Sequence, residues 1–416
     1  MNIITHIGVG NFHRSHQETY LNDLLKNDPT FNWRYVGIGM LQSDERTLCR
    51  LRHDHFKYHV VSLHDSDLTT ECVHTLEDMI LFPDHPDECL WTLCDPMVKI
   101  VSITITEYGY TLQLTDDDYS LIDHFFTGGH LEIGSLSSVT TFGLILAGLA
   151  CRFITGTRPF TVMSCDNING NGDICREKCI RAVSGLGSLA AFSTWIRDEV
   201  KFPNTMVDRI TPALNDVEAI KLESSLDVMN PVICERYRAW VIEDSFVDGL
   251  RPPWEDVGAE LTDDVKVYEE LKLSLLNVPH SFLAYLGISQ GYVHVHEVVK
   301  NNDNYREISC FMDEVIKTIE RNEKNTNIDY EGYAHTVLER FANEALKDTL
   351  VRIASDGVSK FKAQGRPILM RGLSQGYKME YFAKYLRLWG QFEPLVLSGI
   401  IEELSVSFPE FTGTLV

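Results

Sequence analysis

The sequence predicts an α/β protein in which a doubly wound, mostly parallel sheet is followed by a mainly α-helical C-terminal domain. Three observations predict this class. Strand and helix patterns alternate over roughly the first two hundred residues, a glycine pair follows the first strand, and only helical stripes occur beyond about residue 265. A chain of 416 residues exceeds one ordinary core, so we expect two domains, 1–263 and 264–416, with a linking segment from about residue 201.

The predicted strands of the first domain are short apolar runs, rich in β-branched residues, that end at turn residues. They cover residues 3–9, 33–40, 57–63, 99–106 and 159–164, and a further strand-like piece covers 237–246. A helix is predicted at 15–25, between the first two strands. This alternation is typical of βαβ units, whose connections place helices on the faces of a parallel sheet.

The second domain is predicted to consist of amphipathic helices. Apolar side chains recur at helical spacing from Ile308 to Ile319 and again from Val337 to Leu346. The linking segment, about 201–264, contains five prolines. Prolines interrupt regular elements, so their density favours a connecting segment.

Composition excludes several classes of partner. The formal net charge is −23, from 37 basic and 60 acidic residues, and such a surface repels nucleic acids and anionic membranes. The longest apolar run, 142–150, is too short to span a bilayer, and the N-terminus does not resemble a signal peptide. The ten cysteines, Cys175 and Cys179 included, lack zinc-site spacing. We therefore expect a cytoplasmic protein with reduced thiols and no metal.

The glycine pair predicts a dinucleotide site. Gly8, Val9 and Gly10 follow the first strand, and Asn11 and Phe12 lead into the first helix. Glycines at such a turn let backbone amides approach a pyrophosphate, as in Rossmann-type domains. The third position of the fingerprint is histidine rather than glycine, so a plain tight turn is the alternative interpretation.

Polar side chains at strand ends are further candidates, because ligands of such sheets bind at the carboxyl ends of the strands. Asp44 follows the second strand and is the candidate for the adenosine ribose of NAD, whereas Arg46 would favour the 2′-phosphate of NADP. Glu107 and Asn167 follow two later strands. Ordinary solvated or turn residues are the competing interpretation for all of them.

Lys272, Asn277 and His280 form the most informative motif. On a regular α-helix their offsets place all three within one sector of the surface, along about 12 Å. A base for a hydroxyl proton and donors for the oxygen are what the oxidation of an alcohol requires. Pro279 is expected to kink this helix or to begin a new one. A solvated lysine and a helix-end asparagine are the alternative, although the apolar surroundings favour a buried site.

Arg352 and Lys360 flank a glycine turn further along the chain. Two cations at such a turn suggest a clamp for a polyhydroxylated or anionic substrate. Basic groups that stabilise a helix C-terminus are the alternative.

These motifs together resemble the mannitol dehydrogenase family, the polyol-specific long-chain dehydrogenases. The stretches that carry the resemblance keep the family's order and cover most of the chain: 8–14, 104–109, 164–167, 202–212, 240–244, 272–280 and 352–360. The resemblance implies a Rossmann-type domain, a helical domain and an active site between them. It also implies NAD(H)-dependent, metal-independent oxidation of a secondary alcohol to a ketose.

The resemblance also assigns roles to single residues. Lys272 would be the general base, and Asn167 and Asn277 would stabilise the developing oxyanion. The remaining matches are His280, Arg352, Lys360 and Asp208 for substrate contacts, and Glu269 for proton passage to solvent.

The resemblance suggests D-mannitol and D-fructose as the leading substrate pair. Fructuronate or tagaturonate reduction and D-arabinitol oxidation are alternatives within the family. A different class, a catalytically silent dinucleotide-binding sensor, is disfavoured by the intact lysine, asparagine and histidine set. A monomer or small homo-oligomer is expected.

Overall fold

The computed structural model describes residues 1–64, 67–128, 131–184, 189–323, 325–326, 328–355 and 357–415. The chain divides into two compact units. Unit 1 comprises Met1–Ser62 and Leu68–Val265, and unit 2 comprises Leu63–Asp67 and Lys266–Val416. Each unit has its own core and is described by itself.

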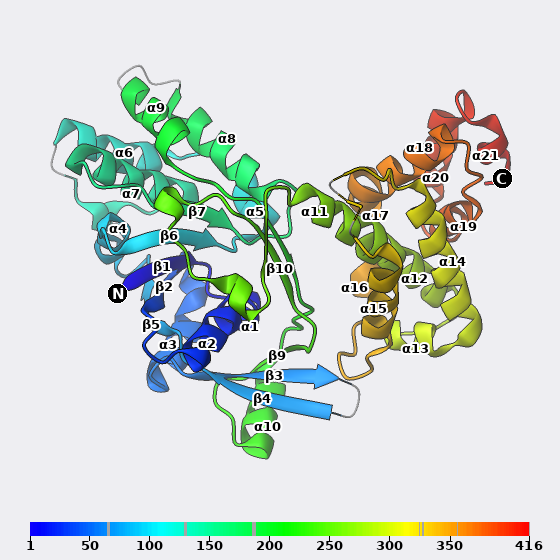
Figure 1. The fold of residues 1–416 in the computed structure, drawn as a ribbon, viewed down its shortest axis with the longest axis horizontal. Coiled ribbons are helices and arrows are strands. Elements are labelled where there is room, and N and C mark those ends of the chain that lie inside the picture. The colour runs from blue at the N-terminus through cyan, green and yellow to red at the C-terminus, as the bar shows by residue number, and fades with distance from the viewer. Residues whose placement is uncertain are drawn as a thin grey trace. The chain divides into compact units, whose positions relative to one another are not determined.

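Unit 1 is built on a five-stranded sheet whose neighbouring strands are all parallel (Figure 1). Its strands are β1 (Asn2–Ile7), β2 (Trp33–Gly39), β5 (Leu76–Leu81), β6 (Val98–Ile103) and β7 (Thr161–Ser164). They lie in the order β5-β2-β1-β6-β7. This is the Rossmann order, in which the chain winds outward from β1 in both directions, and it confirms the predicted fold class.

Both faces of this sheet are buried, because side chains along each strand alternate between the faces. Ile4 and Tyr35 join one core with α2 (Gln17–Asn27) and α3 (Glu45–His53). Ile7 and Ile38 join a second core with the helices α4 (Pro86–Cys94), α7 (Thr141–Thr155), α8 (Asn171–Ser184) and α9 (Ala190–Glu199). α6 (Asp116–Thr127) adds Leu121 and Ile122 to this second core. The remaining helices of the unit are α1 (Asn11–Ser15), α5 (Thr106–Thr111) and α10 (Asp216–Leu226).

The expected linking segment belongs to unit 1 and forms regular strands. It contributes β8 (Thr205–Asp208), β10 (Ala239–Glu243) and β11 (Glu260–Thr262), which pair in the order β11-β10-β8. It also contributes β9 (Val232–Glu235) to a small sheet with β3 (Tyr58–His64) and β4 (Asp67–Val73). Trp240 and Trp254 are buried against each other, with ring centroids 4.8 Å apart. The prolines lie outside these strands, so they end elements rather than disorder the segment.

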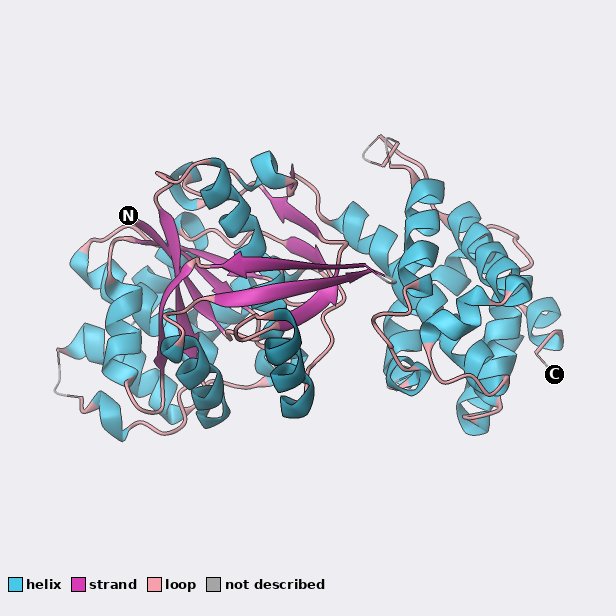
Figure 2. Cartoon of the chain, turned by 90° about the horizontal axis from the view of Figure 1, so that it is seen from below, coloured by secondary structure: helices cyan, strands magenta, loops and turns pink. Residues whose placement is uncertain are grey.

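Unit 2 is helical, and Figure 2 shows its regular elements as helices. They are α11 (Lys266–Lys272), α12 (Val278–Ser289), α13 (Val295–Lys300), α14 (Asn302–Thr318), α15 (Tyr330–Ala342), α16 (Leu350–Ala354), α17 (Gly357–Lys360), α18 (Arg366–Ser374), α19 (Glu380–Gly390), α20 (Pro394–Ser405) and α21 (Pro409–Gly413). The two predicted apolar stripes lie in one buried core with α12. None of the helices within the described residues is long and apolar enough to cross a membrane.

Two π-helical turns interrupt the helices of unit 2. Leu273–Asn277 joins α11 to α12, and Phe361–Gly365 joins α17 to α18. Each is followed by a helix with a proline in its first turn, Pro279 or Pro367. A proline has no amide to donate and its ring crowds the carbonyl four residues earlier, so a wider turn relieves the clash without ending the helix. The predicted kink at Pro279 therefore takes the form of a π-helical turn.

Candidate active site

The glycine turn after β1 is fastened to both neighbouring strands. Gly8 adopts a φ of +98°, and a Cβ at this position would lie 2.2 Å from the carbonyl oxygen of Thr104. The Gly8 amide donates to the Ile38 carbonyl at 3.0 Å, and the Thr104 hydroxyl donates to the Gly8 carbonyl at 2.9 Å. A Cβ on Gly10 would meet only the Gly8 carbonyl, at 3.9 Å. The open space at Gly10 suits the close approach of a dinucleotide pyrophosphate.

Two stacked histidines, His6 and His13, pack next to this turn, and His6 contacts it directly. The His6 and His13 rings lie 3.4 Å apart and nearly parallel, and both side chains are fully buried. His6 Nε2 lies 2.9 Å from the Thr104 hydroxyl and 3.2 Å from the Gly8 carbonyl, and its Nδ1 lies 2.8 Å from the Ser102 hydroxyl. Burial lowers the pKa of both imidazoles, so they are neutral. The neutral tautomer with a proton on Nε2 satisfies these contacts.

His13 occupies the third position of the glycine fingerprint, where a Rossmann helix otherwise packs closely on the strand. Here the imidazole pair fills that space, and His13 Nδ1 lies 3.2 Å from a carboxylate oxygen of Glu18. Sequence reasoning missed His6 and Glu18 as parts of the site. The signal in the sequence was His13 itself, because a histidine at the third glycine position excludes the usual close packing of the helix on the strand.

Alanine substitutions at the two glycines should have different consequences. We expect Gly8→Ala to lower stability by about 1–3 kcal/mol, because it combines a positive φ with a backbone clash. Gly10→Ala should fold with a melting temperature within about 2 °C of the wild type and yet bind NADH at least tenfold more weakly. Thermal unfolding and fluorescence titration measure the two effects. Unchanged NADH affinity in Gly10→Ala would show that the cofactor does not approach this turn.

Asp166 is a second structural residue that the sequence interpretation missed. Its buried carboxylate accepts hydrogen bonds from the amides of Ile105 (3.0 Å) and Thr106 (2.8 Å) and from the Tyr110 hydroxyl (2.8 Å). Burial raises the pKa of this carboxyl group, whereas the hydrogen bonds oppose that shift. Asp166 thus ties the loop after β6 to the end of β7. The neighbouring Asn167 is exposed, directly beyond β7.

Glu107 does not lie at a strand end as expected. β6 ends at Ile103, and Glu107 is exposed in the first turn of α5. The reason is the Asp166 carboxylate, which holds the backbone of residues 105–106 in a turn where Thr106 has a φ of +62°. Asp44 is half-buried beyond β2, and its carboxylate accepts a hydrogen bond from the Leu41 amide at 3.1 Å. Asp208 is the buried last residue of β8.

The lysine motif lies on one continuous helical segment of unit 2. Lys272 is the last residue of α11 and is only 9% exposed, Asn277 is half-buried at the end of the π-helical turn, and His280 lies in the first turn of α12. Because a π-helical turn separates Lys272 from Asn277, the expected regular spacing of 100° per residue does not apply. Glu269, also buried, lies one turn before Lys272 in α11.

His280 is buried in a cationic environment. Its ring stacks on Phe341 with centroids 4.4 Å apart. Burial lowers the pKa of His280 to about 3, Asp348 opposes this shift, and the nearby cations Arg352 and Lys360 contribute to it. The imidazole is therefore neutral in the physiological range. Its Nε2 is buried and has no hydrogen-bond partner among the described residues, which leaves it available for a substrate hydroxyl.

The charges of Arg352 and Lys360 act on the pKa of His280, so both cations lie near this ring. The exposed Arg352 pairs with Asp348, with Nε 2.7 Å from the carboxylate, and Lys360 donates to the Ile353 carbonyl at 2.8 Å. Unit 2 thus contains six of the predicted site residues, and His280, Arg352 and Lys360 interact electrostatically. The other three are Glu269, Lys272 and Asn277, on the helical segment that leads to His280. Asn167 and Asp208 belong to unit 1. Among the described residues no three His, Cys, Asp or Glu side chains cluster as metal ligands would.

Comparison with known proteins identifies the family. The mannitol dehydrogenase Rossmann-domain model matches residues 1–256, and the mannitol dehydrogenase C-terminal-domain model matches residues 264–394. The chain therefore belongs to the mannitol dehydrogenase family and is an oxidoreductase, as the sequence predicted.

Individual relatives are similar over most of the chain. Mannitol dehydrogenase 2 of Saccharomyces cerevisiae is 35% identical over 86% of this chain and 70% of its own length. Polyol:NADP oxidoreductase of Gluconobacter oxydans is 36% identical over 86% of this chain and 73% of its own. The solved structure of Pseudomonas fluorescens mannitol 2-dehydrogenase, a ternary complex with NAD and D-mannitol, is 31% identical with a TM-score of 0.80. It covers 100% of this chain and 90% of that chain.

Proposed function

We propose that this enzyme interconverts D-mannitol and D-fructose with NAD(H) as the cofactor. The observation that carries the proposal is the helical segment of unit 2, where Lys272 is buried two turns before the unpartnered His280 Nε2. A buried amine and a vacant hydrogen-bonding nitrogen are the parts that a polyol oxidation requires. The relative solved with NAD and D-mannitol supports the choice of substrate and cofactor.

Lys272 is the general base in this proposal. It accepts the proton of the reacting hydroxyl, and Glu269 in the preceding turn passes that proton towards solvent. Asn277 and Asn167 donate hydrogen bonds to the oxygen as its negative charge develops, and such preorganised donors stabilise the transition state without reorganisation. When bound, NAD supplies the acceptor for the hydride that leaves the carbinol carbon.

The remaining residues position the polyol chain. His280, which is neutral, accepts or donates one hydrogen bond to a substrate hydroxyl, and Arg352, Lys360 and Asp208 contact further hydroxyl groups. The Arg352 guanidinium already pairs with Asp348, and the Lys360 amine already donates to a backbone carbonyl. Asp348 is only 11% exposed and accepts hydrogen bonds from two nitrogens of Arg352, so a substrate carboxylate would have to displace a bidentate partner, whereas a neutral hydroxyl group would not. This observation favours a polyol over the sugar acids fructuronate and tagaturonate.

A substrate panel tests this choice. We expect D-fructose with NADH to give kcat/KM at least tenfold above that for fructuronate, tagaturonate and the ketose of D-arabinitol. Initial rates at 340 nm measure the series, and oxidation of D-mannitol and D-sorbitol tests the reverse direction. A preference for fructuronate would assign the enzyme to sugar-acid reduction. Tight NADH binding with no turnover of any member would indicate a sensor instead.

A further inference from the structure

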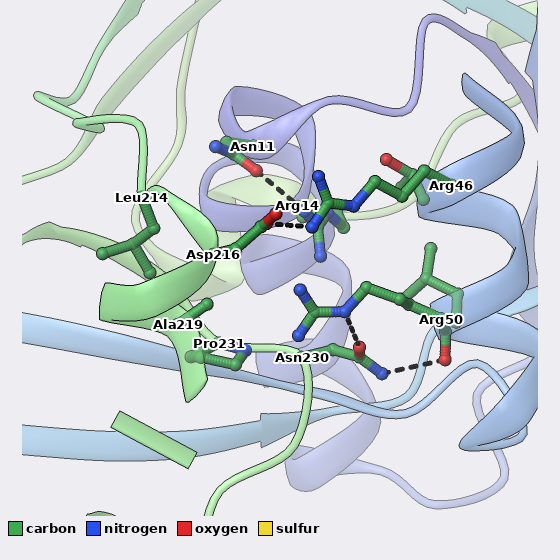
Figure 3. A pocket seen from close by; sticks show the side chains of 11 residues that line it. Asn11, Arg14, Arg46, Arg50, Leu214, Asp216, Ala219, Asn230 and Pro231 are labelled. Carbon is green, nitrogen blue, oxygen red and sulfur yellow. Dashed lines mark hydrogen bonds and ion pairs between the residues drawn. The ribbon is translucent and has the colours of Figure 1, made fainter. Parts of the chain in front are cut away.

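A polar cavity lies in unit 1, between α1, α3 and α10 (Figure 3). We call it the arginine pocket, and its volume is about 160 Å³. Its polar lining comprises Asn11, Arg14, Arg46, Thr47, Arg50, Asp216 and Asn230. Three guanidinium groups thus surround a cavity to which only one carboxylate contributes, in a chain whose overall charge is −23. This local reversal of charge indicates an anionic ligand.

Two of the three arginines have carboxylate partners, but these ion pairs are partly or largely exposed. Arg46 pairs with Asp216, and both side chains are more than half exposed, at 62% and 56%. Arg50 pairs with Glu223 and donates from Nε to the Asn230 side-chain oxygen at 3.0 Å. Exposed ion pairs contribute little free energy, so an anion can replace Asp216 at Arg46 at small cost.

Arg14 is the most incompletely paired of the three. It is only 8% exposed, donates to the Asn11 side-chain oxygen at 2.7 Å, and makes no ion pair within the described part of the chain. Its Nε is buried without a hydrogen-bond partner. Glu18 acts on Arg14 electrostatically, but burial raises the pKa of Glu18 to about 7, so this carboxyl group is a weak counter-charge. A buried charge without a partner is energetically costly, so binding of an external anion at Arg14 would be favourable.

The position of the pocket relates it to the adenosine half of a dinucleotide. Asn11 and Arg14 follow the Gly8–Gly10 turn, and Arg46 and Arg50 lie in α3, which follows β2. In Rossmann domains the adenosine ribose lies near the end of the second strand, where an acid binds its 2′-hydroxyl or an arginine accommodates a 2′-phosphate. Asp44 does not line the pocket, and its carboxylate is held within its own turn by the Leu41 amide. An acid, Asp44, and arginines such as Arg46 therefore both lie in the region that follows the second strand.

We propose that the arginine pocket binds the 2′-phosphate of NADP(H), so that the enzyme uses NADP(H) as well as NAD(H). Arginine forks match the oxygens of a phosphate monoester in bidentate geometry. The proposal rests on the dinucleotide-dependent function proposed above and extends it to a second cofactor.

Cofactor kinetics and binding test this proposal. Wild-type enzyme should bind NADPH with an affinity within tenfold of that for NADH. Arg46→Ala should lower the ratio of kcat/KM for NADPH to that for NADH at least tenfold, and Arg46→Lys should restore part of it. The matched control is Arg181→Ala, an exposed arginine of α8 that pairs only with Glu177. A ratio that falls equally in the control, or no NADPH binding at millimolar concentration, would overturn the proposal.

Fragments of the cofactor separate a specific phosphate site from general attraction of anions. Calorimetry should show 2′-AMP binding at least tenfold more tightly than 5′-AMP or inorganic phosphate, with the preference lost in Arg46→Ala/Arg50→Ala. Equal affinity for the three ligands would contradict the assignment. These measurements require no polyol, so failure of polyol turnover with intact 2′-AMP binding would count against the proposed function alone.

Discussion

Replacing Lys272 by alanine should abolish most polyol oxidation and leave the cofactor bound. Positioned acid–base catalysis typically contributes about 10²–10⁴-fold, so we expect kcat for D-mannitol to fall at least a hundredfold near neutral pH. Lys272 is buried in unit 2, whereas the glycine turn that is expected to hold the dinucleotide belongs to unit 1. NADH affinity should therefore change less than threefold. Stopped-flow rates and fluorescence titration measure the two quantities.

Three further measurements make this prediction specific to a proton acceptor. Lys317→Ala, which removes an exposed lysine of α14, should leave kcat within twofold of the wild type and controls for lost charge. Added methylamine should restore part of the activity of Lys272→Ala, because a small amine fits the space that the side chain vacates. The ascending limb of the pH–rate profile should also disappear. Near wild-type turnover in Lys272→Ala would remove this lysine from the role of base.

Loss of either asparagine amide should have the second largest effect. Removing one preorganised donor to a developing oxyanion costs about 2.7–4 kcal/mol, or roughly 10²–10³ in kcat. We expect this loss in Asn277→Ala and in Asn167→Ala, with less than threefold change in NADH affinity. Asn277→Asp retains the shape and removes the donor, so its kcat should fall at least as far. Steady-state kinetics of the single and double variants measure the effects.

The double variant tests whether the two amides act on the same atom. If both donate to one oxygen, the loss in Asn167→Ala/Asn277→Ala should fall short of the product of the single losses, because groups that act as a unit are not additive. Full additivity would indicate separate targets. A parallel fall in cofactor affinity and in melting temperature would instead show that the asparagines have a structural role.

The predicted elements that depend on local pattern agree with the structure. The first strand, the glycine turn and the stripe from Ile308 to Ile319 follow from apolar periodicity and from the backbone freedom of glycine. The lysine motif was recognised for the same reason, because its residues lie within nine positions of one another. What the local pattern could not supply is the π-helical turn between Lys272 and Asn277, which changes their angular relation.

The linking segment shows how composition can mislead. Five prolines between 201 and 264 suggested a connector, although each proline lies outside the strands of that region. Trp240 and Trp254 explain why the segment folds as part of unit 1. Burying two indole side chains removes a large apolar area from water, and this favours a packed structure over an exposed connector. The same region supplies Asp208 at the end of β8.

The sequence by itself determined the α/β class, the helical second unit and the apolar segment from Lys272 to His280, because each is written in local spacing and residue type. The ordered set of motifs indicated the family. Only the tertiary structure revealed the histidine pair next to the glycine turn, the hydrogen bonds of Asp166 to residues 105–106, and the arginine pocket. Their partners are distant along the chain: His6 contacts Ser102 across 96 positions, and Arg50 contacts Asn230 across 180. Such pairs exist only after folding closes the intervening loops, and no local pattern encodes which distant polar groups then meet.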